Sequence, residues 1–265
     1  MRVALTAGFD RAPNVLALAE LLRRDGHVIA GILVVTPYRL RRLRSLVRQR
    51  GKAVVVESVR RLVGLRPRGS RADPIDIFLR RHDIAFRSIR KWCGAHGVSY
   101  LTVFDLNAPA AIAWLGAAAP DVVVYGGGGI LGTPFLEAAG RRVLNAHSGR
   151  MPEIRGMNAC EWSLLLGVPL TVTIHYIDEG IDTGAMVERI SLLEEPGDTI
   201  ERLRGKCIVA GIEGLRRAVG SLQTGTAERA VGADSHRQCY VMAPVIRELL
   251  QARMRRKASK GRGEL

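Results

Sequence analysis

The sequence predicts a Rossmann-like α/β fold, a doubly wound and mostly parallel sheet. Two observations support this class. Short runs of β-branched and other apolar residues alternate with stretches of helical apolar spacing, as in successive βαβ units. In addition, Val28 to Val35 is almost entirely apolar, which is typical of a strand buried on both faces of a parallel sheet. We also expect a basic helical insertion and a helical C-terminal extension.

The elements of the first half of the chain alternate regularly. Apolar runs predict strands at residues 3–6, 28–35, 98–104, 121–125 and 142–147. Apolar residues at helical spacing predict helices at residues 13–24, 84–96, 108–118 and 134–139. Ligands of such folds bind at the carboxyl ends of the strands, near the point where the strand order reverses. Residues that follow the predicted strands are therefore the first candidates for a functional site.

The pattern changes in the second half of the chain. It predicts a helix that begins after residue 158 and ends at residue 166, strands at 170–177 and 186–192, and a long helix at 198–219. Either Asp198 or Thr199 is expected to cap the long helix. The sequence shows no internal repeat and no clear linker. We therefore expect one α/β domain over residues 1–220, and an extension with a basic tail over residues 221–265.

The formal charge of +15 is concentrated in two segments, so the rest of the chain is close to neutral. Residues 36–72 contain twelve basic side chains and a single acidic one. Leu40, Leu43 and Val47 recur there at helical spacing, which predicts one or two basic amphipathic helices. Such helices pack on the protein body, lie on an anionic membrane or follow the phosphates of a nucleic acid, and we favour packing. The second segment is the tail from residue 247 onward, for which a solubilising end is the simplest interpretation.

Composition excludes several classes of protein. With 47% hydrophobic and 25% charged residues, the chain can bury a core, which excludes wholesale disorder. No apolar run approaches the roughly 18 residues of a membrane span, and the first residues lack the pattern of a secretory signal. The four cysteines have no metal-type spacing and fit buried thiols in a reducing compartment. We therefore expect a cytoplasmic protein without a bound metal.

The first candidate segment is a run of four glycines, Gly126 to Gly129, directly after the predicted strand at 121–125. Consecutive glycines cost conformational entropy, so we expect this loop to need positive φ angles or a close backbone approach. Ile130 and Leu131 follow the glycines, so the order does not match the G-x-G-x-x-G pattern of dinucleotide-binding loops. A plain flexible turn remains the alternative.

The second candidate segment is Asn145-Ala146-His147, at the end of a predicted strand. Side chains alternate along a strand, so Asn145 and His147 are expected on the same side. An amide donor beside a titratable imidazole can polarise a carbonyl group and transfer a proton. Taken alone, His147 could equally be a structural histidine.

The third candidate segment runs from Thr173 to Gly184 and contains His175 and three carboxylates in a loop bounded by glycines. A carboxylate at Asp182 beside a histidine would favour the imidazolium form. For Asp178 and Glu179, solvated loop charge is the simpler interpretation. His175 fits a core position as well as a functional one.

Together the three segments resemble the formyltransferases that use 10-formyltetrahydrofolate, a family that includes glycinamide ribonucleotide transformylases, methionyl-tRNA formyltransferases and amino-sugar N-formyltransferases. The resemblance extends over about residues 98–205. It is based on the glycine loop ending in Ile130-Leu131, on Asn145-x-His147 followed by Pro152-x-x-Arg155-Gly156, and on Asp178-Glu179-Gly180-Ile181-Asp182-Thr183-Gly184. The family usually continues its histidine with a serine and two leucines, whereas this chain has Ser148-Gly149-Arg150-Met151. This difference from the family's usual sequence affects the expected contacts to the acceptor and not the residues that match the family's catalytic ones.

The resemblance implies a role for each segment. Asn145, His147 and Asp182 match the catalytic residues of the family. The residues implied to hold the folate are Gly128, Gly129, Ile130, Leu131, Ile177, Asp178, Glu179, Gly180 and Ile181. Arg155 and Gly156 would contact the acceptor. In the expected reaction, His147, kept protonated by Asp182, and the Asn145 amide stabilise the oxyanion that forms when an amine attacks the formyl carbon, and Asp182 helps to remove the amine proton.

The remaining sequence bears on the acceptor. Residues 6–11 lack the Gly-Ser-Asn phosphate turn that glycinamide ribonucleotide transformylases carry, and place Asp10 there instead. Only 45 residues follow Gly220, too few for the carboxyl-terminal barrel of methionyl-tRNA formyltransferases. We therefore expect an N-formyltransferase for a primary amine of a small molecule: an amino sugar, a nucleotide-linked sugar or a natural-product amine. The alternatives are an enzyme like methionyl-tRNA formyltransferase, and a catalytically idle paralogue that binds RNA or a membrane surface through residues 36–72. A homodimer is also left open.

Overall fold

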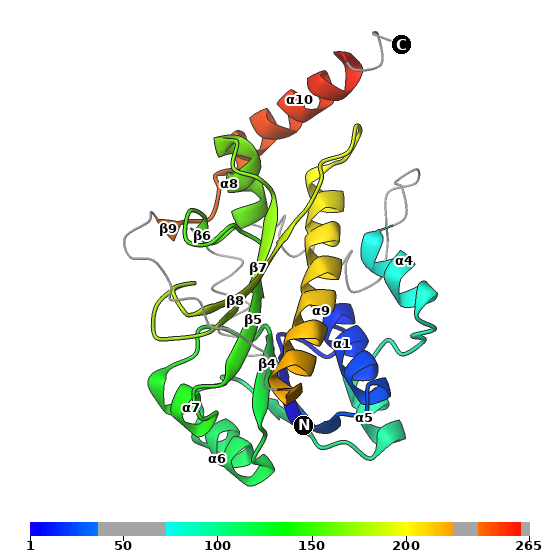
Figure 1. Cartoon of the computed structure of the whole chain (residues 1–265), viewed down its shortest axis with the longest axis vertical. Helices are drawn as coiled ribbons and strands as arrows, with labels where there is room; N and C mark the ends of the chain where they lie inside the picture. The colour runs from blue at the N-terminus through cyan, green and yellow to red at the C-terminus, as the bar shows by residue number, and fades with distance from the viewer. Residues whose placement is uncertain (37–72, 225–237, 261–265) are drawn as a thin grey trace.

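The main sheet has seven strands, and the computed structural model that contains it describes residues 1–36, 73–224 and 238–260. The strand order is β3-β2-β1-β4-β5-β7-β8 (Figure 1). The strands are β1 (Arg2–Ala7), β2 (Val28–Val35), β3 (Tyr100–Val103), β4 (Val122–Gly126), β5 (Val143–His147), β7 (Thr171–Tyr176) and β8 (Met186–Ser191). The five strands from β3 to β5 in this order pair in parallel. β7 pairs antiparallel with both of its neighbours, β5 and β8. The predicted doubly wound, mostly parallel sheet is confirmed.

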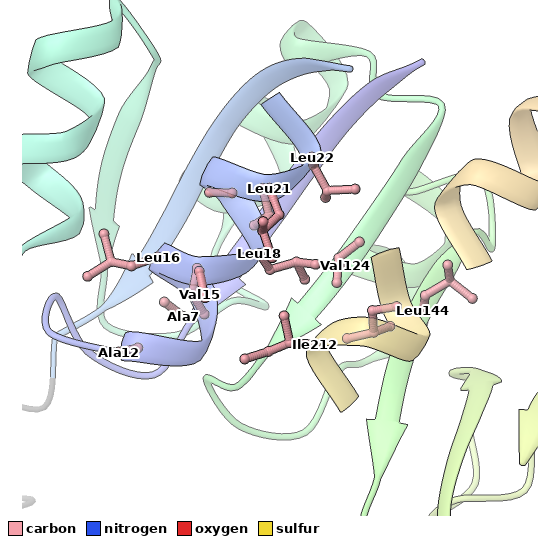
Figure 2. Close-up of a cluster of buried hydrophobic side chains, with 14 of the residues drawn as sticks. Ala7, Ala12, Val15, Leu16, Leu18, Leu21, Leu22, Val124, Leu144 and Ile212 are labelled. Carbon is pink, nitrogen blue, oxygen red and sulfur yellow. The ribbon is translucent and has the colours of Figure 1, made fainter. Parts of the chain in front are cut away.

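Helices form a layer on each face of this sheet (Figure 1). One layer consists of α1 (Pro13–Arg24), α4 (Pro74–Arg81), α5 (Ile89–His96) and α9 (Ile200–Thr224), and the other of α6 (Pro109–Ala118) and α7 (Thr133–Ala138). Because side chains alternate along a strand, each central strand contributes to the hydrophobic core on both faces of the sheet. Leu5 and Val124 face the α1 layer, while Ala4 and Val123 face the α6 layer. Figure 2 shows Leu18 and Leu22 of α1 on the side of Val124 of β4 and Ile212 of α9, whereas Leu16 points away from them.

The long helix α9 lies close to the strands that carry the candidate site. A Cβ atom at Gly214 would lie 2.6 Å from Ile190 Cδ1, and one at Gly211 would lie 3.0 Å from Ala146 Cβ. Glycine at these positions therefore lets the helix backbone approach the sheet. The helix begins where Thr199 Oγ1 accepts the backbone N–H of Arg202 at 3.2 Å, so Thr199 is the cap.

Three helices differ from the sequence-based prediction. The helix expected at 84–96 begins only at Ile89, because Ser88 Oγ accepts the backbone N–H of Lys91 and caps it there. Helix α4 was not predicted; the Asp73 carboxylate accepts the Ile75 N–H at 3.1 Å and caps its start. Helix α9 continues to Thr224, so the domain division after residue 220, which stays a prediction, falls inside it.

The C-terminal segment returns to the protein body. β9 (Gln238–Cys239) pairs in parallel with β6 (Arg155–Gly156), and α10 (Pro244–Lys260) contacts α8 (Ala159–Leu166). The predicted helical C-terminal part is thus present (Figure 1). The predicted basic insertion lies outside the described residues from residue 37 onward. Within the described ranges, every helix is too short or too polar to cross a membrane.

Candidate functional site

The candidate site lies at the carboxyl edge of the sheet, where β1 and β4 are neighbours and the strand order reverses. Thr6 fixes the glycine loop to this edge: its Oγ1 donates to the Gly127 carbonyl at 2.9 Å and accepts the Gly126 N–H at 3.2 Å. Gly127, Gly128 and Gly129 have φ angles of +113°, +133° and +115°. The expectation that this loop needs positive φ angles is therefore confirmed.

The three residues predicted to be catalytic come together around one carboxylate. Asp182 Oδ2 lies 3.2 Å from His147 Nδ1, and Asp182 Oδ1 lies 3.5 Å from His175 Nε2. Asn145 Nδ2 lies 3.1 Å from the same His175 nitrogen. The side chains of Asn145 and His147 thus meet that of Asp182 from a second segment of the chain, and His175 connects Asn145 with Asp182.

His175 is a site residue whose role the sequence left open. It lies opposite Asn145 in the antiparallel pairing of β5 with β7, and it is only 1% exposed. Its Nδ1–H donates to the Tyr176 carbonyl at 2.8 Å, so Nε2 faces the Asn145 amide and Asp182. The signal that could have found it is the register between the two strands, because the register decides which side chains meet.

The local environment keeps Asp182 ionised. Burial by itself raises the pKa of this carboxyl group, but the neighbouring His175 and His147 rings lower it more. The backbone N–H of Gly156 donates to Asp182 Oδ2 at 2.8 Å and adds to this effect. The net pKa lies below the ordinary value of an aspartate.

In contrast to Asp182, His147 is kept in its uncharged form by its surroundings. Burial lowers the pKa of His147, and Asp182 and the Ile154 carbonyl raise it only in part. The net pKa lies below the ordinary value of 6.5, so the ring is neutral at neutral pH. The expectation that Asp182 keeps His147 protonated is therefore wrong, because desolvation outweighs the attraction of the carboxylate.

The predicted folate residues surround a pocket of about 130 Å³ between the glycine loop and the loop at 177–182. The predicted residues that line it are Gly129, Ile130, Leu131, Ile177, Asp178, Glu179, Gly180 and Ile181. Gly128 is not among its lining residues; a Cβ atom there would lie 2.7 Å from Leu106 Cδ1. Asn145, His175 and Asp182 also line the pocket.

The two acidic residues of the second loop have different roles. Asp178 organises the loop, since its Oδ1 accepts the Gly180 N–H at 3.1 Å and the Thr183 hydroxyl at 2.6 Å. Glu179 is exposed and pairs with Arg141 at 2.7 Å. The interpretation of solvated loop charge therefore fits Glu179 but not Asp178.

A second cavity, of about 190 Å³, adjoins this pocket (called the folate pocket below, after the predicted ligand) at Tyr125 and Asn145, which line both. Arg155 and Gly156, predicted to contact the acceptor, are not among the residues that line either of these two cavities. They lie in β6, where Gly156 supports Asp182 through its backbone N–H.

Asp10, which stands in the turn after β1, is used within the fold. Its Oδ1 accepts the Arg90 N–H at 2.9 Å and the Tyr100 hydroxyl at 3.2 Å. The carboxylate therefore stabilises the start of α5, and its hydrogen bonds are made within the fold.

Comparison with known proteins agrees with this geometry. A family model described as formyl transferase matches residues 7–219. The methionyl-tRNA formyltransferase of Anaeromyxobacter dehalogenans (strain 2CP-C) is 34% identical over 138 residues, which are 51% of this chain and 44% of that protein. That of Geobacter metallireducens is 30% identical over 155 residues, 58% of this chain and 49% of that protein. The chain thus spans about half the length of these curated relatives.

Solved structures show the same fold. A phosphoribosylglycinamide formyltransferase from Bacillus halodurans superposes with a TM-score of 0.59 at 19% identity, over 84% of this chain and 96% of that one. A sugar N-formyltransferase from Shewanella sp. FDAARGOS_354 also gives a TM-score of 0.59, at 12% identity, over 96% of this chain and 87% of that one. At these identities the similarity is one of fold.

Proposed function

The chain belongs to the formyl transferase family, and from that premise we propose that it transfers a formyl group from 10-formyltetrahydrofolate to the primary amine of a small-molecule acceptor. The observation that supports this most strongly is that Asn145 and Asp182 line the pocket between the two loops, with His147 Nδ1 3.2 Å from Asp182 Oδ2. We further infer a reaction in the cytoplasm, to which the free thiols of all four cysteines are suited.

The pocket suits the folate chemically. Leu131 and Ile177 supply apolar walls for a flat ring, and the backbone of residues 178–181 supplies hydrogen-bonding groups at its edge. When bound, 10-formyltetrahydrofolate supplies the formyl carbon. Asn145 lies at the boundary between this pocket and the second cavity, so a donor on one side and an acceptor on the other would meet beside its amide.

Asn145 and His147 have complementary tasks in this proposal. Asn145 has one amide N–H directed to His175 and a second available to the formyl oxygen, where negative charge develops during attack. Removal of one such donor typically costs about 3–4 kcal/mol of transition-state stabilisation.

The neutral His147 ring is suited to take up the amine proton by way of Asp182, because Asp182 lines the pocket and lies 3.2 Å from His147 Nδ1. Both of its nitrogens face acceptors: Nδ1 faces Asp182, and Nε2 lies 2.9 Å from the Ile154 carbonyl. A second ring N–H would therefore find a partner at once, and the ionised Asp182 would stabilise the resulting charge.

The first experiment measures folate binding and turnover in the same preparation. Reduced folates should raise the melting temperature in a concentration-dependent manner, because a ligand present at 100 times its Kd stabilises the native state by about 2.7 kcal/mol. Incubation with 10-formyltetrahydrofolate and a panel of amines should then yield tetrahydrofolate and an N-formyl product. No melting shift with any reduced folate, together with no N-formyl product, would refute the proposal.

Methionyl-tRNA is a second candidate acceptor, because the curated relatives reported above are named methionyl-tRNA formyltransferases. Formylation of methionyl-tRNA at a higher kcat/KM than any small amine in the panel would favour it. Formylation of a small amine without measurable formylation of methionyl-tRNA would favour the first proposal.

A further inference from the structure

The second cavity lies between α1, α9 and the ends of β4 and β5, and Asn145 lines both this cavity and the pocket between the two loops. Its volume of about 190 Å³ is larger than the volume of about 130 Å³ of the pocket between the two loops. The cavity thus has room for the reacting end of a molecule.

The walls of this cavity are mainly aliphatic. Its apolar side chains are those of Leu5, Val15, Leu18, Val124, Ala146, Ile208, Ile212 and Leu215. Figure 2 shows Leu18 of α1, Val124 of β4 and Ile212 of α9 gathered in this layer. Asn14, Ser148 and Asn145 add uncharged polar groups, and none of the lining residues, all of which belong to the described ranges, is charged.

The basic side chains next to these walls in the sequence of α9 are directed elsewhere, and of these Arg216, which follows Leu215, pairs with Asp25. Lys206 is bonded to Asp198 at 2.7 Å and to Glu195 at 3.0 Å. Arg204 pairs with the fully buried carboxylate of Glu161. A carboxylate or phosphate inside the cavity would therefore lose its hydration without gaining an opposite charge from these walls, which is costly.

We propose that this cavity holds the group that carries the reacting amine, and that this group is compact, uncharged and largely apolar. The inference depends on the proposed function and narrows it to a substrate class: a primary amine on a hydrocarbon-rich group. In that position the amine nitrogen lies at the Asn145 end of the cavity and attacks the formyl carbon held on the other side. The new N–formyl bond forms, the C–N bond to the folate breaks, and the amine proton passes by way of the site residues to the departing folate nitrogen.

The test compares two primary amines of similar size at equal concentrations of the unprotonated form, isopentylamine and phosphoethanolamine. A hydrophobic pocket discriminates by about 10–200-fold for a single methylene, so kcat/KM should be at least about tenfold higher for isopentylamine. Methionyl-tRNA forms a third arm, since it carries its amine beside an uncharged apolar side chain. Transfer to methionyl-tRNA but not to isopentylamine would support the same cavity chemistry with an aminoacyl ester as its source.

Substitution of Ile208 changes the wall of the cavity and should leave the folded core intact, because this side chain lines the cavity and is 41% exposed. Ile208→Glu should lower kcat/KM for isopentylamine by about tenfold or more, since one unpaired charge at the wall costs at least ~1.4 kcal/mol. Ile208→Met should restore most of the activity. Val245→Glu, at a 61% exposed position on α10, is the matched control and should leave both amines unaffected. The KM for 10-formyltetrahydrofolate should stay unchanged in all three variants.

The outcomes separate this inference from the proposed function. Transfer to phosphoethanolamine as fast as to isopentylamine, or an Ile208→Glu variant with unchanged selectivity, would overturn the apolar cavity while leaving formyl transfer intact. Failure to formylate any of the three acceptors, with no melting shift from reduced folates, would overturn the proposed function and this inference with it.

Discussion

Asn145 lies directly opposite His175 in the β5–β7 pair, with its amide nitrogen 3.1 Å from His175 Nε2. The tight packing around His175 holds that ring in place, because it is only 1% exposed and its Nδ1–H is bonded to the Tyr176 carbonyl. A predicted catalytic amide is thus oriented by a histidine on the neighbouring strand. The first prediction follows from this relationship.

Replacement of His175 by leucine should lower kcat by about 100-fold. The Asn145 amide would remain but would lose its orientation, and misplacement of a catalytic group can cost that much. The KM for the folate should change little, because the loops at 126–131 and 177–182 remain. Steady-state kinetics checks this, with His175→Gln as the variant that retains a hydrogen-bonding side chain. Equal activity of the leucine and glutamine variants would show that His175 only fills space.

Removal of the Asn145 amide itself should be more costly. We expect Asn145→Ala to lower kcat by about 100- to 1,000-fold, the usual cost of losing one oxyanion donor. The melting shift produced by a reduced folate should persist, because most of the folate pocket is formed by other residues. Turnover within a few fold of the wild type would remove Asn145 from the mechanism.

The pH dependence of kcat should reflect a neutral His147. The pKa of His147 is lowered below 6.5, mainly by burial, so kcat should remain constant as the pH falls through 6.5 and decline only at lower pH. In the residual activity of Asp182→Asn, the decline should move to still lower pH, because the carboxylate partly raises the pKa of His147. A pH–rate profile of both proteins tests this. A midpoint above 6.5 in the wild type would contradict the neutral ring.

Gly156 should be sensitive to a single added methyl group. A Cβ atom there would overlap the Cys239 carbonyl oxygen and disturb the N–H that donates to Asp182. Gly156→Ala should therefore lower kcat by at least about tenfold, in addition to the ~1–2 kcal/mol of left-handed strain expected from its φ of +93°.

Gly140→Ala is the matched control for Gly156. Gly140 has a φ of +59°, and a Cβ atom there would meet nothing within 4 Å, so only the strain applies. Chemical denaturation and kinetics on both variants separate stability from turnover. Equal kcat values in the two variants would mean that the β6–β9 contact does not support Asp182.

Glu20 should contribute to stability at neutral pH. It is buried on α1 and accepts hydrogen bonds from Trp92 Nε1 at 2.9 Å and from Arg24 at 2.7 Å. Burial alone raises its pKa, but bonds from Arg23, Trp92 and Arg24 lower it to about 2. The native state therefore gains stability from ionised Glu20 above its ordinary pKa of 4.5, and this gain is lost as the pH falls towards 2.

The corresponding test uses Glu20→Gln. Its free energy of unfolding should be about 1–3 kcal/mol lower than that of the wild type at pH 7, and the difference should shrink between about pH 5 and pH 2. Glu137→Gln, at a side chain that is 62% exposed, should change stability by less than about 0.5 kcal/mol. Urea denaturation at several pH values measures both. A constant difference across this pH range would contradict the linkage.

Much of the fold was predictable because apolar spacing is a local property. Helix α1 has the predicted bounds, and β2 coincides with the apolar run that first indicated a parallel sheet. The two-residue strands β6 and β9 were not predictable in this way, because a pair of residues carries no periodicity and its partner lies more than 80 positions away. Helix α4 was missed beside the arginine-rich segment, where charge obscures the apolar face formed by Ile75, Phe78 and Leu79.

The proximity of the candidate residues was predictable, but their electrostatics were not. The motifs indicated Asn145, His147 and Asp182, and the structure brings their side chains together. The protonation of His147 was predicted wrongly, because it depends on how completely the ring is buried, and a sequence pattern does not state burial. The role of Gly156 was missed for a similar reason, since a backbone N–H leaves no trace in the identity of a residue.

The most direct test of formyl transfer is mass spectrometry of a single incubation that contains wild-type protein, 10-formyltetrahydrofolate and isopentylamine. The account predicts an N-formyl amine in amounts equal to the tetrahydrofolate released, and almost none with Asn145→Ala. Release of free formate without any N-formyl product, from isopentylamine or from methionyl-tRNA, would contradict it.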